Sequence, residues 1–244
     1  MIPHWIIATK MKKPLFILLA FLAFKGQAQE LKAQELLEKS IAYHDPEGKW
    51  ANFKGGFTVQ METPKRPVRT TKIELDFSQQ YFKSEVERGG VTTTAEWKAG
   101  QCAHRLEGST TFTVAQAKEH GLNCERTNKM RDYYVYLYGL PMKLKDPGTQ
   151  LDPKVYTKIF KGKSYYCLKV TYDEKVGKDI WYFYLDKTTS QLRHYQFYHN
   201  EAENDGEYIL LSGEANIGGI KIPKDRAWYM NADNRYLGTD FLYQ

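Results

Sequence analysis

The feature that most constrains this fold is a period-two alternation of apolar and polar residues over most of the chain. Phe57, Val59 and Met61 alternate with polar residues, and Ile73, Leu75 and Phe77 repeat the pattern. Successive side chains of a strand point to opposite faces, so the alternation predicts strands with one buried face. No strand–helix–strand alternation recurs, which favours an antiparallel sheet over a parallel one.

Turn-forming residues divide the alternating segments into two groups of strands. In the first group, two strands contain the residues named above, and three follow at 81–88, 91–99 and 101–107. The second group begins after Pro153, with strands expected at 155–160, 165–172, 180–186, 191–199, 207–211, 214–217, 219–228 and 236–242.

Helical periodicity appears in three places. Residues 31–43 place their apolar side chains on one stripe, and a helix is expected there. Between the two groups of strands, 114–120 predicts a short helix that ends at Gly121, and Asn123 predicts the N-cap of a longer helix over 125–138. Residues 143–153 are rich in turn formers and are expected to be a loop.

The order of these segments predicts a mainly β fold of the α+β class. A long antiparallel sheet must curl, pair its edges or cover one face. A curled sheet or incomplete β-barrel, covered by the N-terminal helix and the central helical insertion, meets that need, because the helices and the strands each have one apolar face to bury.

The N-terminus has the pattern of a secretory signal peptide. Lys12 and Lys13 precede an apolar run over 15–24, and small residues at Gly26 and Ala28 predict export and cleavage near Ala28. An N-terminal membrane anchor is the alternative, but ten apolar residues are too few to span a bilayer. The expected organisation is an extension and signal peptide over 1–28 and a single curled-sheet domain over 29–244.

Removal of that signal changes the meaning of the net charge. The chain has 35 basic and 29 acidic residues, a formal charge of +6. Residues 1–28 hold four lysines and no acids, so the mature chain has 31 basic residues and a charge of +2. Nucleic-acid binders have strongly basic domains, so no nucleic-acid partner is expected. The basic cluster Lys65, Arg66, Arg69 and Lys72 is interpreted as a solvated hairpin tip.

The three cysteines predict one structural feature. An exported chain sits in an oxidising space, where disulfides persist. Cys102 and Cys124 flank a short helix and are the candidate pair. Cys167 lies in a strand-like segment and is interpreted as a small buried residue.

The order of elements resembles the LolA-like plan of periplasmic lipoprotein carriers. That resemblance implies an incomplete β-barrel that wraps around helices and holds acyl chains between them. The segments YDEKVGKDIWYFYLD (172–186), YLYGLP and MKLKDPGT (136–149) are also similar to an uncharacterised family of exported bacterial proteins. This second resemblance implies no known activity, and neither one assigns a functional residue.

No motif for a nucleophile, a nucleotide or a metal is found, and neither a cofactor nor a metal is expected. Asp173, Glu174 and Asp179 form a possible acid cluster at the end of an aromatic strand, where they could act as acid or base with His199. Acids beside lysines are more often a soluble hairpin tip. The sequence therefore favours a binding protein over an enzyme.

Bulky apolar residues of the strands and of the central helix are the candidate ligand-binding residues, because small-molecule sites are mostly apolar concavities. They are Phe57, Val59, Phe77, Trp97, Met130, Tyr134, Leu137, Tyr138, Leu168, Trp181 and Phe183. The alternative is a packed core with no cavity. The sequence favours an exported, periplasmic or secreted, protein that binds a lipid, an acyl chain or another apolar small molecule. An envelope hydrolase and a structural or assembly partner of another envelope protein are the alternatives.

Overall fold

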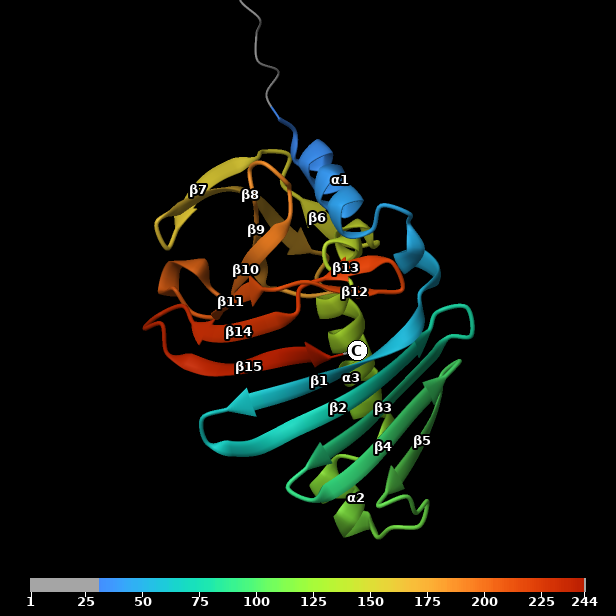
Figure 1. Cartoon of the computed structure of the whole chain (residues 1–244). Coiled ribbons are helices and arrows are strands. Elements are labelled where there is room, and N and C mark those ends of the chain that lie inside the picture. Colours follow the sequence, from blue (N-terminus) through green and yellow to red (C-terminus); the bar gives the residue numbers. More distant parts are fainter. Residues whose placement is uncertain (1–30, 244) are drawn as a thin grey trace, which may run out of the picture. The chain divides into compact units, whose positions relative to one another are not determined.

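The computed structural model describes residues 31–243, so the predicted signal peptide lies outside the described part of the chain. Within these residues, thirteen strands form one antiparallel sheet in the order β5-β4-β3-β2-β1-β15-β14-β11-β10-β9-β8-β6, with β7 also paired to β8 (Figure 1). The sheet curls but its two ends do not meet, and the predicted incomplete barrel is confirmed.

The first half of the chain follows the predicted order. It contains α1 (Ala33–His44), β1 (Lys54–Thr63), β2 (Arg66–Asp76), β3 (Tyr81–Arg88), β4 (Val91–Lys98) and β5 (Gln101–Leu106). The central insertion comprises α2 (Val114–His120) and α3 (Cys124–Tyr138). Gly121 caps α2 in the left-handed conformation, and the Asn123 side chain accepts a hydrogen bond from the Arg126 amide, as a helix N-cap does.

The second half contains β6 (Thr149–Leu151), β7 (Tyr156–Phe160), β8 (Lys163–Tyr172), β9 (Ile180–Leu185), β10 (Leu192–Tyr198), β11 (Glu207–Ser212), β12 (Ala215–Ile217), β13 (Ile220–Ile222), β14 (Asp225–Met230) and β15 (Tyr236–Tyr243).

Two expectations for this half were wrong. Residues 143–153 are not all loop, because β6 pairs there with β8. Residues 219–228 are not one strand: β13 pairs with β12 in a separate hairpin, and β14 joins the main sheet. Pro223 lies between them and has no amide hydrogen to donate to a ladder.

The last strand joins the two halves of the sheet. β15 pairs with β1 over Thr58–Glu62 and with β14 on its other side. The N-terminal meander and the C-terminal strands are therefore continuous through the sheet, and both contribute side chains to the same inner face.

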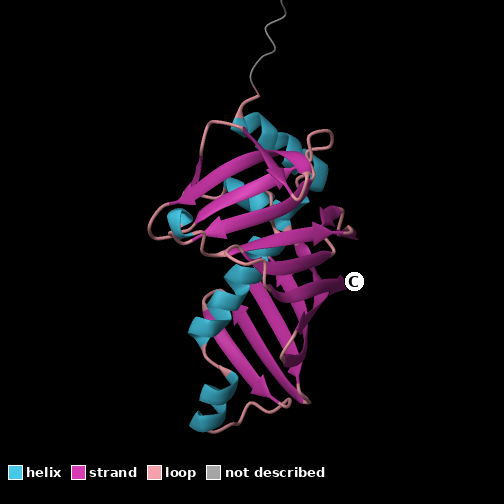
Figure 2. Cartoon of the chain, turned by 90° about the vertical axis from the view of Figure 1, so that its left-hand side faces the viewer, coloured by secondary structure: helices cyan, strands magenta, loops and turns pink. Residues whose placement is uncertain are grey.

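Helix α3 lies along that inner face, with α2 beyond its N-terminal end (Figure 2). The rings of Phe57 and Tyr138 stack 4.7 Å apart between β1 and the end of α3. Arg226 of β14 is buried, donates to the Leu137 carbonyl at 3.3 Å, and lies 3.9 Å from the Tyr138 ring. Gly139 permits close packing there, because a Cβ at this position would lie 2.3 Å from the Trp50 ring. These contacts fix the C-terminal end of α3.

Helix α1 is attached through its last residue. The side chain of His44 is buried and bridges two strands. Nδ1 donates to the Lys221 carbonyl at 2.6 Å, and Nε2 accepts from the Leu192 amide at 3.0 Å. Burial lowers the pKa of His44, which matches a neutral ring with one donor and one acceptor nitrogen. No helix within residues 31–243 is long and apolar enough to span a bilayer.

The outer face of β8–β10 carries a second aromatic cluster. The strand β9 directs Phe183 inward and Tyr182 and Tyr184 outward, as the alternation predicts. His194 of β10 stacks on Tyr184 with ring centroids 4.1 Å apart, and its Nε2 has no hydrogen-bond partner within residues 31–243. Burial, with the charges of Arg193 and Lys161, lowers the pKa of His194 to about 3.

This histidine makes stability depend on pH. The unfolded chain binds a proton at His194 near pH 6.5, whereas the folded chain does not, so the stabilisation present at neutral pH is lost as pH falls below about 6.5. When the pH is lowered from 7 to 5, the unfolding free energy of the wild type should fall by up to about 2 kcal/mol more than that of His194→Phe. Urea unfolding at both pH values measures this difference.

His199→Gln is the matched control for this test. The hydrogen bond to Asp179 raises the pKa of the exposed His199, so its contribution to stability is present at low pH and is lost as the pH rises. Removal of His199 should therefore not reduce the loss of stability between pH 7 and pH 5. An unchanged pH dependence in His194→Phe would show that His194 does not titrate on unfolding.

Candidate functional site

A cavity of about 280 Å³ lies between the N-terminal half of α3 and the inner face of β2–β4. We call it the arginine cavity. Strand residues that line it are Arg69, Thr71, Ser84, Val86, Arg88, Val91, Thr93 and Ala95. The residues that line it from α2, α3 and the loop between them are Glu119, His120, Gly121, Leu122, Arg126, Thr127, Met130 and Tyr134.

The strand side of this cavity changes in polarity along the strands. Paired residues of adjacent antiparallel strands lie side by side and point to the same face, so they form rungs across the sheet. The rung nearest the Gly89–Gly90 turn consists of Arg69, Arg88 and Val91. The next two rungs are Thr71, Val86 and Thr93, and then Ile73, Ser84 and Ala95. The last rung consists of Leu75, Phe82 and Trp97. The first rung is therefore charged, the middle rungs mix hydroxyl and apolar groups, and the last rung is apolar.

The arginines of the charged rung form no ion pair among the described residues, although Asp240 of β15 lies on the same rung beyond Met61 of β1. Burial raises the pKa of Asp240, and the charges of Arg226 and Arg69 oppose that rise. Arg69 and Arg88 are directly opposite each other in the register of β2 and β3. The Nε atom of each is buried without a hydrogen-bond partner, and neither forms an ion pair with any residue of 31–243. Burial first, and then the charges of Arg69, Arg66 and Arg126, lower the pKa of Arg88. Three like charges thus meet around one partly buried space.

Helix α3 supplies the third arginine from the opposite wall. The Arg126 side chain lies against Gly121, where an added Cβ would come within 2.4 Å of the Arg126 Cδ. Nearby, His104 of β5 contacts the Thr127 hydroxyl at 2.9 Å. Tyr134 is buried, and burial raises its pKa while Arg69 and Arg88 oppose that shift. The phenol is therefore neutral and close to both strand arginines.

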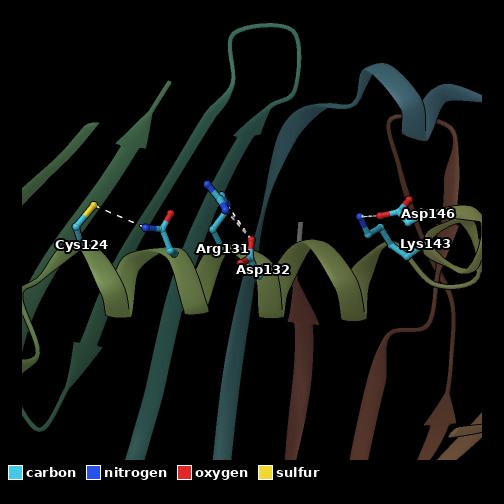
Figure 3. A network of polar contacts seen from close by, with 6 residues as sticks. Cys124, Arg131, Asp132, Lys143 and Asp146 are labelled. Atoms are coloured by element: carbon cyan, nitrogen blue, oxygen red, sulfur yellow. Dashed lines mark hydrogen bonds and ion pairs between the residues drawn. The ribbon is translucent and has the colours of Figure 1, made fainter. Parts of the chain in front are cut away.

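A disulfide holds α3 at this end. Cys102 of β5 and Cys124 of α3 are bonded with their Cα atoms 5.6 Å apart, as the sequence suggested. Cys102 is paired with Trp97 in the register of β4 and β5, so the tether lies beside the apolar rung. The guanidinium of Arg131 lies 4.0 Å above the Trp97 ring. Figure 3 shows Cys124 at the start of α3 and Arg131 further along it.

A second cavity, of about 510 Å³, lies near the other end of α3, and we call it the aromatic cavity. It is lined by Asp132, Val135, Tyr136, Lys143, Asp146, Tyr172, Lys175, Val176, Gly177, Asp179 and Trp181. The hydroxyls of Tyr136 and Tyr172 are hydrogen-bonded, and Lys143 pairs with Asp146 (Figure 3). Among the charged residues of this cavity, Asp132, Lys143, Asp146 and Asp179 form ion pairs, unlike Arg69 and Arg88 of the arginine cavity.

The structure divides the predicted ligand-binding residues into three sets. Met130 and Tyr134 line the arginine cavity, and Trp181 lines the aromatic cavity. Phe77 and Trp97 pack at the margin of the core. The remaining residues are at most 4% exposed and belong to the closed core: Phe57, Val59, Leu137, Tyr138, Leu168 and Phe183.

The predicted acid cluster is dispersed among different partners. Asp173 accepts from Gln150 at 2.6 Å, and Glu174 pairs with Lys178 at 3.0 Å. Asp179 lines the aromatic cavity and pairs with His199 at 2.7 Å. Within residues 31–243, no group of three His, Cys, Asp or Glu side chains is placed to hold a metal ion.

Sequence reasoning missed the arginines. The sequence placed Arg69 in an exposed hairpin tip. Arg69 is an even number of residues from Ile73 and Leu75, so it lies on the same face of β2 as these buried side chains. Arg88 likewise shares its parity with Phe82 and Ser84. Strict use of the two-residue period would have directed both arginines to the inner face.

A model of the family described as "Family of unknown function (DUF6503)" matches residues 12–243, and no curated protein matches the chain. Among solved structures, the chain is similar to a LolA superfamily protein from Nitrosomonas europaea, with 12% identity, a TM-score of 0.48, and coverage of 88% of this chain and 92% of that one.

A putative outer membrane lipoprotein-sorting protein domain from Vibrio parahaemolyticus has 11% identity and a TM-score of 0.48, with coverage of 86% and 89%. A DUF1329 family protein from Desulfovibrio piger has 8% identity and a TM-score of 0.47, with coverage of 87% and 91%.

The disulfide makes a measurable contribution to the stability of this site. We expect the double variant Cys102→Ala/Cys124→Ala to lose about 3 kcal/mol of unfolding free energy, because the cross-link restricts the unfolded chain. Urea unfolding measures the loss. A reductant should bring the wild type to the level of the variant and leave the variant unchanged, and equal stability of all four samples would contradict the tether.

Proposed function

The chain belongs to DUF6503, a family of unknown function, and from the geometry of its inner face we propose that it is an exported binding protein for an amphipathic molecule. The apolar part of that molecule would lie between α3 and strands β2–β4. Export rests on the predicted signal peptide, and an envelope location follows from it as part of the proposal.

The observation that carries the proposal is the uneven packing of α3. Tyr138 and Leu137, at its C-terminal end, are at most 4% exposed in the closed core. Met130 lies eight residues before Tyr138 on the same helix, and Ala95 faces α3 from β4. Both are only half-buried, and both line the arginine cavity. Protein interiors pack without such spaces, so a concavity with apolar walls is the usual form of a ligand site.

The lining suits a molecule with two kinds of surface. Val86, Val91, Leu122 and Met130 offer apolar contact, whereas the charged rung lies at one end of the cavity. A purely apolar ligand would leave the polar groups without partners, which is unfavourable in a partly buried site. The dispersed partners of Asp173, Glu174 and Asp179 favour this binding role over hydrolysis by those acids.

A substitution that fills the cavity tests the proposal. Ala95 points into the arginine cavity from β4, so Ala95→Trp should block it and weaken binding of a fluorescent fatty-acid probe by about tenfold or more, the effect of losing a buried apolar contact surface. Fluorescence titration of the purified mature chain measures the affinity, and urea unfolding verifies that the variant is folded.

Ala103→Trp is the matched control. Ala103 is an exposed residue of β5. It is next to His104, the register partner of Ala95, and therefore faces away from the cavity. It should bind the probe as the wild type does. Equal affinity in Ala95→Trp and the wild type would exclude the arginine cavity as the site. Failure of the wild type to bind the probe, together with no lipid in mass spectra of protein taken from its host, would overturn the proposed function.

A further inference from the structure

We propose that Arg69, Arg88 and Arg126 bind a phosphate monoester group at the head of the amphipathic ligand. The inference rests on the proposed function and adds the chemical class of the ligand. It is argued from the register of the strands, the hydrogen-bonding state of the arginines, and the charges that line the cavity.

The position of the arginines requires an explanation. Like charges directly opposite each other on neighbouring strands destabilise a sheet. Arg69 and Arg88 occupy such a pair on the inner face, where partial burial weakens screening by water. Other arginines have partners: Arg131 pairs with Asp132, and Arg226, although its buried Nε is also unpartnered, donates to two carbonyls through its terminal nitrogens. An anion bound between Arg69 and Arg88 would turn their repulsion into attraction.

The hydrogen-bonding state supports the same conclusion. Guanidinium groups present donors in a planar fork that matches the oxygens of phosphates and carboxylates. The buried Nε atoms of Arg69 and Arg88 lack partners within residues 31–243. Most buried polar atoms of native proteins are satisfied, so two unpartnered atoms on one rung point to a ligand that supplies the acceptors.

The charge count selects the kind of anion. Three guanidinium groups and one carboxylate, Glu119, line the cavity, which leaves two positive charges; Asp240, which acts on Arg69 from outside the lining, is paired in register with Arg226, whose charge offsets it. A phosphate monoester carries a charge of about −1.5 to −2 at neutral pH, whereas a carboxylate carries −1. The monoester therefore neutralises the site more completely. Hydroxyls of Thr71, Ser84 and Thr93 lie on the next two rungs and can donate to further oxygens.

The order of the rungs sets the direction of the ligand. A head group at the arginine rung would lie near the Gly89–Gly90 turn, and the chain would run past Val86 and Ala95 toward the rung of Leu75, Phe82 and Trp97. Decyl phosphate, used below its micelle concentration, is a suitable probe because it joins a phosphate monoester to an apolar chain.

The test compares decyl phosphate, decanoate, decanol and inorganic phosphate by calorimetry and by the shift in Tm. We expect the mature wild type to bind decyl phosphate roughly tenfold or more tightly than decanol, as charge-assisted hydrogen bonds would give. Bound ligand stabilises the folded chain, so decyl phosphate should also raise Tm more than decanol does. Inorganic phosphate should bind more weakly than decyl phosphate, because it lacks the chain.

The double variant Arg69→Met/Arg88→Met removes both guanidinium groups and leaves unbranched apolar side chains in their place. It should bind decyl phosphate no more than about twofold better than it binds decanol, since the charge-assisted bonds are gone. Arg105→Met is the matched control, because Arg105 is exposed on the outer face of β5. It should leave all four affinities unchanged.

Each other outcome counts against a defined claim. If decanol and decyl phosphate bind equally well to the wild type, or the double variant keeps the preference for phosphate, the arginine site is wrong while the proposed function stands. If decanoate matches decyl phosphate, the choice of a phosphate monoester is wrong. If inorganic phosphate binds as well as decyl phosphate, the head group does not belong to an amphiphile. Failure of every decyl probe overturns the proposed function as well.

Discussion

The attachment of α3 at both ends is the constraint on which the rest of this structure depends. At one end the Cys102–Cys124 disulfide joins the helix to the edge strand β5. At the other end Arg226 donates to the Leu137 carbonyl, and Tyr138 stacks on Phe57. These two attachments fix where each end of α3 lies on the inner face of the sheet. Leu137 and Tyr138 pack into the core at the C-terminal end of α3, the aromatic cavity lies beside Val135 and Tyr136, and the arginine cavity lies along the N-terminal half of the helix.

That cavity is also where the sequence breaks the rules that govern the rest of the sheet. Elsewhere the inner face carries residues such as Ile73, Leu75 and Phe82, each at most 3% exposed. At the arginine rung it carries two cations side by side, neither of which forms an ion pair among residues 31–243. Local violations of packing and charge rules in native proteins concentrate at functional sites, because the rest of the fold stabilises them. The coincidence of an open space with an unbalanced charge is thus more informative than either feature alone.

Much of the fold follows from the sequence because its signals are local. Turn residues and the two-residue period placed β3 at its observed bounds. Gly121 marked the end of α2, and Asn123 marked the start of α3. The cavity depends instead on how far α3 stands from the sheet, which no local pattern encodes. For this reason the apolar candidates were divided between cavity and core, and Phe183 was as plausible a ligand contact as Trp181 until the packing was known. The arginines were missed for a different reason, since composition near a turn was given more weight than strand parity.

The net charge illustrates why local arrangement decides recognition. Without the predicted signal peptide the formal charge would be only +2, and so small a basic excess gave no reason to expect an anionic partner. Yet opposite charges elsewhere pair on the surface, as Lys72 does with Glu85 and Lys83 with Glu74, on the outer face of the same strands. Those pairs cancel over a few ångströms, whereas three guanidinium groups share one recess with a single carboxylate. Since exposed charges are screened within about 8 Å at physiological salt and partly buried ones much less, a ligand in the recess would respond to this cluster rather than to the net charge of the chain.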